Sequence, residues 1–155
     1  MSTISTSGGR DRSTRVTPTP QIYLTFNGQC EAAFRFYAER LGTVPGPMFP
    51  YAQSPMAGDA PAGWGVKIMH GSITLGHLTI AGADVPPAKY EPGQGFRLFL
   101  ESDDPAQTER WFDALAQNAT IEMPLQQTFW SVRFGLLRDQ FGIPWTLSCA
   151  QSPDS

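Results

Sequence analysis

The chain has 155 residues, of which 41% are apolar and 16% are charged, and its formal net charge is −3 at pH 7. This length is enough for one domain with a hydrophobic core. The negative charge excludes the basic surface that holds a nucleic-acid backbone. The apolar runs are also far shorter than the ~20 residues that cross a bilayer. We therefore expect neither nucleic acid nor a membrane among the partners.

The two ends of the chain are polar. Residues 1–20 are rich in Ser, Thr, Gly, Pro and Arg, and they cannot bury enough surface to offset the entropy lost on ordering. We expect a flexible N-terminal tail without the apolar run of a secretory signal, and a frayed C-terminus at 151–155. Cys30 and Cys149 lack metal or disulfide spacing, so we expect two separate buried thiols in a cytoplasmic protein.

The first folded segment predicts a strand followed by a helix. From Gln21, the apolar residues Ile22, Leu24 and Phe26 alternate with other side chains, which is typical of a strand. An apolar stripe with helical spacing then predicts a helix over 29–41.

Three further strands are predicted before residue 84. Residues 43–63 contain five prolines, so we expect only a short strand at Met48–Tyr51 and then a mobile loop. Strands at 66–75 and 78–81 meet at a turn that carries His77, which we expect at the surface. Residues 82–94 are predicted to form a loop.

The second half repeats this order. Leu98 and Leu100 indicate a strand, and Asp103-Asp104-Pro105 predicts the start of a helix over 104–116. Strands are predicted at Thr120–Leu125, Ser131–Leu137 and Pro144–Cys149, with a turn at Asp139–Gly142 between the last two.

The first half of the sequence can be aligned with the second half. Arg35-Phe36-Tyr37 and Arg110-Trp111-Phe112 lie 75 residues apart in the two predicted helices. We therefore predict an α+β fold in which two βαβββ units, about 21–84 and 95–150, form one domain at 21–150. Their paired curved mixed sheets should enclose a cleft.

Three segments carry a specific resemblance to a known family: YLTFNGQCEAAFRFYAERLG, IMHGSITLGHLTIAGAD, and MPLQQTFWSVRFG followed by DQFGIPW. They resemble the PhnB-like branch of the vicinal-oxygen-chelate superfamily, which contains the glyoxalase, bleomycin-resistance and dioxygenase proteins. The resemblance implies the same fold and a homodimer. Relatives are often described as 3-demethylubiquinone-9 3-methyltransferases, but we find no Gly-rich loop suited to a nucleotide-like methyl donor.

The resemblance also implies positions for metal ligands. In metal-dependent members, His, Glu or Gln side chains hold a divalent ion at four inward positions. The corresponding positions fall near Gln21, Phe96 and Thr146, and Phe and Thr do not form the usual quartet. We therefore predict no cofactor, with a displaced metal site around His70 and Gln21 as the alternative.

Five residues are candidates for binding a small-molecule ligand, namely His70, Glu101, Phe129, Ser131 and Arg133. Strand alternation places the last three on one face, and the all-apolar set Trp130, Val132 and Phe134 on the other, which we interpret as core. Arg133 is then the candidate for gripping an anion. An ion pair of Arg133 with Glu101 or Glu122 remains open, as does a His70 that bonds a neighbouring carbonyl.

Three functions are compatible with these observations. The first is a protein that binds a small polar or anionic molecule in its cleft. The second is a divalent-metal-dependent isomerase or lyase with a non-standard site around His70. The third is a dimeric scaffold without a ligand. Catalysis is left open.

Overall fold

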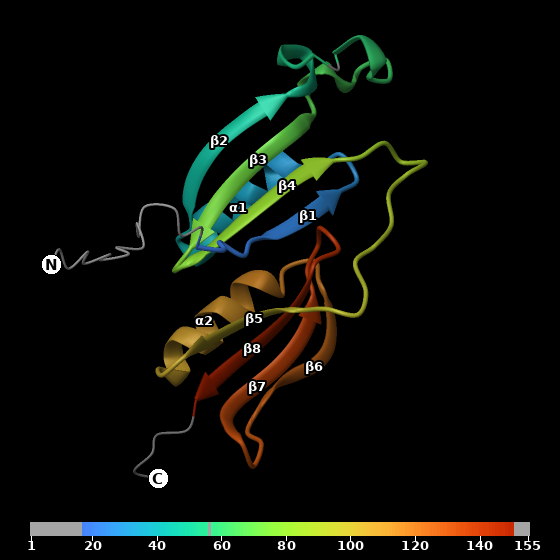
Figure 1. The fold of residues 1–155 in the computed structure, drawn as a ribbon. Coiled ribbons are helices and arrows are strands. Elements are labelled where there is room, and N and C mark those ends of the chain that lie inside the picture. Colours follow the sequence, from blue (N-terminus) through green and yellow to red (C-terminus); the bar gives the residue numbers. More distant parts are fainter. Residues whose placement is uncertain (1–16, 56, 151–155) are drawn as a thin grey trace, which may run out of the picture.

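The computed structural model describes residues 17–55 and 57–150, and they form two halves with the same order of elements (Figure 1). The first half contains β1 (Ile22–Phe26), α1 (Cys30–Leu41), β2 (Val44–Pro50), β3 (Ile68–Leu75) and β4 (Leu78–Asp84). The second half contains β5 (Leu98–Ser102), α2 (Pro105–Leu115), β6 (Thr120–Gln126), β7 (Ser131–Arg138) and β8 (Pro144–Ala150). The predicted α+β fold of two βαβββ units is confirmed.

Each half forms a four-stranded mixed sheet. The strand orders are β1-β4-β3-β2 and β5-β8-β7-β6. β1 runs parallel to β4 and β5 runs parallel to β8, while the other neighbours are antiparallel. In Figure 1 the two sheets lie one above the other, and the linker 85–97 runs along one side of them. The shared topology supports the internal repeat predicted from the sequence.

The two faces of each sheet differ because one of them is covered by a helix. In β1, Leu24 and Phe26 are buried while Tyr23 and Thr25 are exposed, as strand alternation predicts. At Gly82 in β4, an added Cβ would lie 2.9 Å from the ring of Phe34 in α1, so only Gly fits under this helix. We call the side that contacts the helix the helix-facing side, and the opposite side the open face.

The helix ends follow the expected capping chemistry. The Asp104 carboxylate accepts a hydrogen bond from the backbone N–H of Ala106 at 3.0 Å, and Pro105 occupies the first turn of α2. Helix α1 ends at Gly42, whose φ of 72° is in the left-handed region. These contacts confirm both predicted helices.

A buried carboxylate joins the two halves at the turn between β7 and β8. Asp139 Oδ2 accepts hydrogen bonds from Trp145 Nε1 at 2.9 Å and from the hydroxyl of Tyr37 in α1. Asp139 Oδ1 accepts the backbone N–H groups of Phe141 and Ile143 at 2.9 and 3.0 Å. Burial raises the pKa of Asp139 above its ordinary value, although these hydrogen bonds lower it. The predicted turn is confirmed, and it also fixes α1 against the second half.

Aromatic rings extend this contact between the two halves, which we call the joint at Asp139. Phe36 and Tyr37 pack edge-on against Phe141 at centroid distances of 5.6 and 6.0 Å, and Tyr37 packs against Trp145 at 5.5 Å. Helices α1 and α2 also contact each other. The helix-facing sides of both sheets therefore share one hydrophobic core, and the open faces lie outside it.

β2 is longer than the sequence predicts. It begins at Val44 rather than near Met48, and it is the edge strand of its sheet. Its pairing with β3 skips from Pro45 to Met48. An edge strand needs only one row of backbone hydrogen bonds, so its prolines are tolerated. The expected loop between β2 and β3 is present, and its described residues contain 3-10 turns at Tyr51–Gln53, Ala57–Asp59 and Trp64–Val66. β3 therefore begins at Ile68 rather than at residue 66.

β4 is also longer than predicted, because it runs to Asp84 where the sequence predicts a loop over 82–94. The Asp84 side chain is buried, and it accepts the backbone N–H groups of Cys30 at 2.8 Å and Ile68 at 2.9 Å. The carboxylate thereby caps α1 and fixes the first residue of β3. Its partners lie far away in the sequence, which is why a local pattern does not predict a strand here.

The chain ends and the cysteines are the last features of the fold. Residues Thr17–Pro20 are exposed and have no regular secondary structure, while the rest of the predicted tail and residues 151–155 lie outside the described part of the chain. Cys30 and Cys149 are separate buried thiols, as predicted. Within the described residues, no helix has the length and apolar character needed to cross a membrane.

We predict that Tyr37→Phe lowers the free energy of unfolding by about 1–3 kcal/mol, because buried Asp139 loses a hydrogen-bond donor. Urea denaturation at neutral pH measures this change. Tyr23→Phe, at a ring that is 53% exposed, is the matched control and should change stability by less than about 0.5 kcal/mol. Equal effects of the two substitutions would contradict the role given to Asp139.

Candidate functional site

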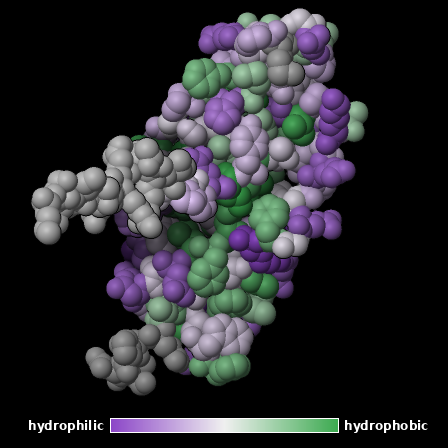
Figure 2. All heavy atoms as spheres, in the orientation of Figure 1, coloured by the Kyte–Doolittle hydropathy of each residue, from purple (hydrophilic) through white to green (hydrophobic). Residues whose placement is uncertain are grey.

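Large apolar side chains are exposed on both open faces. Tyr23 in β1 and Phe99 in β5 are 53% and 59% exposed, and Phe49 in β2 and Trp130 before β7 are 48% and 51% exposed. Figure 2 shows apolar residues gathered over the middle of one face of the molecule, with hydrophilic residues around and between them. Large exposed apolar patches are typical of binding surfaces, so the open faces are the candidate site.

His70 lies on the open face of the first sheet, opposite Phe49 in the pairing of β3 with β2. The Tyr23 hydroxyl lies 3.4 Å from His70 Nδ1, and the two ring centroids are 5.8 Å apart. Partial burial raises the pKa of Tyr23 above its ordinary value. His77 is exposed at the β3–β4 turn, as predicted. The pair of His70 and Tyr23 thus offers polar groups to a ligand on this face.

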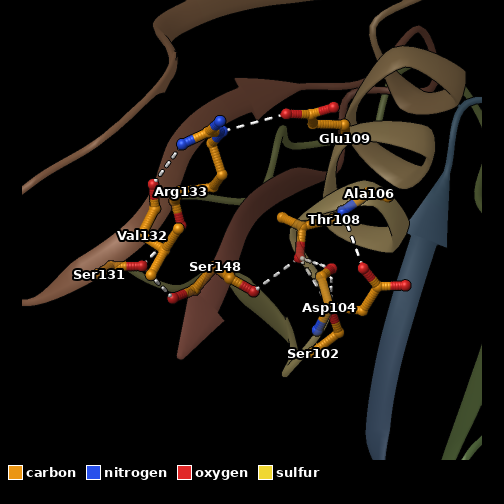
Figure 3. A network of polar contacts seen from close by, with 9 residues as sticks. All are labelled: Ser102, Asp104, Ala106, Thr108, Glu109, Ser131, Val132, Arg133 and Ser148. Atoms are coloured by element: carbon orange, nitrogen blue, oxygen red, sulfur yellow. Dashed lines mark hydrogen bonds and ion pairs between the residues drawn. The ribbon is translucent and has the colours of Figure 1, made fainter. Parts of the chain in front are cut away.

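Arg133 lies on the helix-facing side of the second sheet, beside α2. Its Nε donates to Glu109 of α2 at 3.1 Å, and its Nη1 donates to the carbonyl of Val132 at 2.9 Å (Figure 3). An internal ion pair is the alternative that the sequence leaves open, although the acid is Glu109 rather than Glu101 or Glu122. The guanidinium is therefore held by the protein itself.

The apolar set that begins at Trp130 is not a core face, contrary to the sequence interpretation. Trp130 is half exposed, and its ring packs against Phe134 with a centroid distance of 5.4 Å. At Gly135 an added Cβ would lie 2.8 Å from the ring of Phe112 in α2, so Gly135 is helix-facing. Alternation from Gly135 places Arg133 on the same side and Phe134 on the open face.

Ser131 has its hydroxyl satisfied inside the protein. The Ser131 Oγ lies 2.6 Å from the Arg133 carbonyl oxygen and 3.1 Å from Ser148 Oγ (Figure 3). It also lies 2.6 Å from the carbonyl oxygen of Cys149. Thr108 in α2 extends this network by donating to the Ser148 carbonyl at 3.2 Å. The pairing of β7 with β8 shifts register between Ser131 and Arg133, and the network stabilises the chain at that irregularity.

The other two candidates are exposed on different parts of the second half. Phe129 is 88% exposed in the β6–β7 hairpin, with its ring edge-on to Trp130 at 4.6 Å. Glu101 is exposed on the open face of the second sheet, in register with Ser148. His70 belongs to the first sheet. A single chain therefore does not bring the five sequence-predicted ligand residues together.

The residues at the expected metal positions do not fit a divalent ion. Gln21 is exposed before β1, Phe96 is exposed before β5, and Thr146 is buried in β8. Phe has no donor atom and Thr is a poor ligand. Across residues 17–55 and 57–150, no group of three or more His, Cys, Asp or Glu side chains is placed to hold an ion. The open faces offer hydrogen-bonding and apolar groups instead.

Two cavities, of about 480 and 620 Å³, are both lined by Phe96 at the end of the linker 85–97. The smaller one is lined by Arg97 and Arg138, which sequence reasoning missed. The only signal in the sequence is that each arginine stands at the end of a predicted strand. Their meeting depends on the register of β5, β8 and β7, which the sequence pattern does not specify.

The fold is one that solved structures of other proteins share. The crystal structure of a glyoxylase/bleomycin resistance protein/dioxygenase domain from Frankia sp. EAN1pec matches with a TM-score of 0.60 and 14% identity, over 88% of this chain and 100% of that chain. At this identity the likeness shows the fold alone. The two βαβββ units and this likeness show that the chain has the glyoxalase/bleomycin-resistance fold.

Closer relatives specify the family. Residues 19–148 match the profile of the family described as 3-demethylubiquinone-9 3-methyltransferase. Protein YjdN of Escherichia coli K12 is 33% identical over 134 residues, which are 81% of this chain and 91% of that protein. The crystal structure of PA1353 from Pseudomonas aeruginosa is 39% identical with a TM-score of 0.76, over 86% of this chain and 100% of that chain. The chain belongs to this PhnB-like family.

We predict that Arg133 and Glu109 are coupled in stability. A double-mutant cycle with Arg133→Ala and Glu109→Ala should give a coupling of about 0.2–1 kcal/mol, since both side chains are partly exposed to solvent. Urea unfolding of the four proteins measures it, and the coupling should shrink in high salt. Additive effects of the two substitutions would show that the ion pair contributes nothing.

Proposed function

We propose that this protein binds a small polar or anionic molecule on the open faces of its sheets. The observation that carries the proposal is the pair of His70 and Tyr23, whose polar atoms lie 3.4 Å apart on an open face. A neutral imidazole both donates and accepts hydrogen bonds, and a phenol donates one. The exposed ring of Phe49 supplies an apolar wall beside them. This combination suits a ligand of mixed polarity.

A second copy of the chain completes the site in this proposal. The first open face carries His70 and Tyr23, and the second carries Phe99 and Glu101. A twofold pairing of two copies would set the first open face of one copy against the second open face of the other, which gives two equivalent clefts. Residues that a single chain keeps apart, such as His70 and Glu101, would then line opposite walls.

Methyl transfer is not part of the proposal, although the family description names it. The strand-to-helix turns after β1 and β5 are Asn27-Gly28-Gln29 and Asp103-Asp104, and neither is a Gly-rich loop for a nucleotide-like donor. Both sheets also have a mixed order instead of a doubly wound one. A cytoplasmic location belongs to the proposal, because two buried free thiols suit a reducing compartment.

The binding proposal is tested with a thermal-shift screen of small carboxylates and phosphates. A ligand of the native state raises the melting temperature. For a hit whose affinity is unchanged in Arg138→Gln, we expect His70→Ala to weaken binding by about tenfold, equivalent to one hydrogen bond of about 1.4 kcal/mol. Arg110→Gln, on the exposed surface of α2, is the control and should keep the affinity. Wild-type affinity in both His70→Ala and Tyr23→Phe would place the site elsewhere.

The pairing proposal is tested by light scattering after size exclusion. We expect the wild-type protein to elute as a dimer. Phe99→Asp should dissociate it, because a carboxylate would be buried among apolar groups. Val66→Asp, at an exposed position in a 3-10 turn, is the control and should stay dimeric. A monomeric wild-type protein, or a dimeric Phe99→Asp variant, would contradict the pairing.

A further inference from the structure

The smaller of the two cavities beside Phe96 has the features of a site for an anion. It has a volume of about 480 Å³ and is lined by Gln94, Gly95, Phe96, Arg97, Arg138 and Pro144. These residues come from the end of the linker, the end of β7 and the start of β8, so the cavity opens on the open face of the second sheet. None of them belongs to the pair of His70 and Tyr23.

Arg138 is held in one orientation by the backbone. Its Nη1 donates to the carbonyl of Gly142 at 2.7 Å and to the carbonyl of Gly93 at 3.1 Å. These two bonds occupy one end of the guanidinium. The edge formed by Nε and Nη2 has no protein partner within the described residues, and this edge is the one that binds a carboxylate through two parallel hydrogen bonds. The side chain is therefore a pre-oriented donor for an anion.

The charge of Arg138 is also uncompensated. The neighbouring Arg97 pairs with Glu122 and donates to the carbonyl of Trp145 at 3.1 Å, so its charge is already balanced. In the part of the chain that the structure describes, no carboxylate lies within 4.0 Å of Arg138. The cavity thus carries one unpaired positive charge, and an anion would complete it.

The wall around Arg138 is fixed as well. At Gly142, whose φ is 86°, an added Cβ would lie 2.8 Å from the hydroxyl of Tyr90 in the linker. The linker therefore packs directly against the β7–β8 turn. The hydrogen bond from Arg138 to Gly93 holds the C-terminal part of the linker in place. A cavity whose walls are set in this way loses little entropy when it binds a ligand.

The remaining lining favours a ligand with a flat apolar body. Phe96 is 39% exposed, so part of its side chain is open to a ligand, and Pro144 adds a second apolar surface. The Gln94 amide can donate or accept one further hydrogen bond. We infer that this cavity binds a small carboxylate with a flat apolar body, with the carboxylate on the Nε and Nη2 edge of Arg138 and the body against Phe96.

Benzoate is the probe that tests the inference, with benzamide as its uncharged match, and isothermal titration of the full chain measures both. We expect saturable binding of benzoate and binding of benzamide that is weaker by at least about tenfold. Arg138→Gln should weaken benzoate by at least about tenfold, because it removes the charged edge. Phe96→Ala should weaken it by about 3–10-fold, because it removes a stacking surface.

Two control variants show whether a loss of benzoate affinity is specific to the cavity. Arg110→Gln removes a cation outside the cavity and should keep the affinity for benzoate. His70→Ala should keep it too, which separates this cavity from the site of the proposed function. Phe96→Ala also serves if Arg138→Gln fails to fold, because Phe96 makes no hydrogen bond with its side chain. The inference is overturned if benzoate and benzamide bind equally, or if the benzoate affinity survives both cavity substitutions.

Discussion

The carboxylate of Asp139 is the interaction on which the arrangement of the two halves depends. It accepts hydrogen bonds from the Tyr37 hydroxyl of α1, from the Trp145 indole of β8 and from two backbone N–H groups of its own turn. A buried carboxylate or hydroxyl without partners is costly, so α1 cannot leave the second half without a penalty of a few kcal/mol. This joint holds the helix-facing sides together and turns both open faces outward.

The duplicated topology does not carry a duplicated site. The two open faces have corresponding strands, but the first bears an imidazole beside a phenol, at His70 and Tyr23, and the second bears guanidinium groups at Arg97 and Arg138. The first face offers hydrogen bonds to a polar or anionic group, and the second offers a guanidinium to an anion. A ligand that reached both would need a polar group at one end and an acidic group at the other.

Most of the fold could be predicted because it depends on local chemistry. The alternation around Leu24 predicts β1, and Gly42 marks the end of α1. The candidate site is harder to predict from the sequence. Strand alternation shows which side chains share a face of the sheet, but it does not show which face the helix covers. Trp130 looks like a core residue and Arg133 like a cleft residue, yet each lies on the other side. The sequence pattern does not identify Arg138 as a site residue, because its hydrogen-bond partners are backbone carbonyls of a loop and a turn.

The joint at Asp139 has a consequence for how the protein forms. Tyr37 and Asp139 are 102 positions apart in the chain. A ribosome adds roughly 5–20 residues per second, so about 5–20 s separate the synthesis of the hydroxyl from that of its acceptor. In the later part of this interval, once Asp84 has been added, the nascent first half has all the residues of its sheet and helix, but the outer side of α1 with Phe36 and Tyr37 is uncovered. Such a surface is a target for chaperones and a risk for aggregation until the last strands emerge.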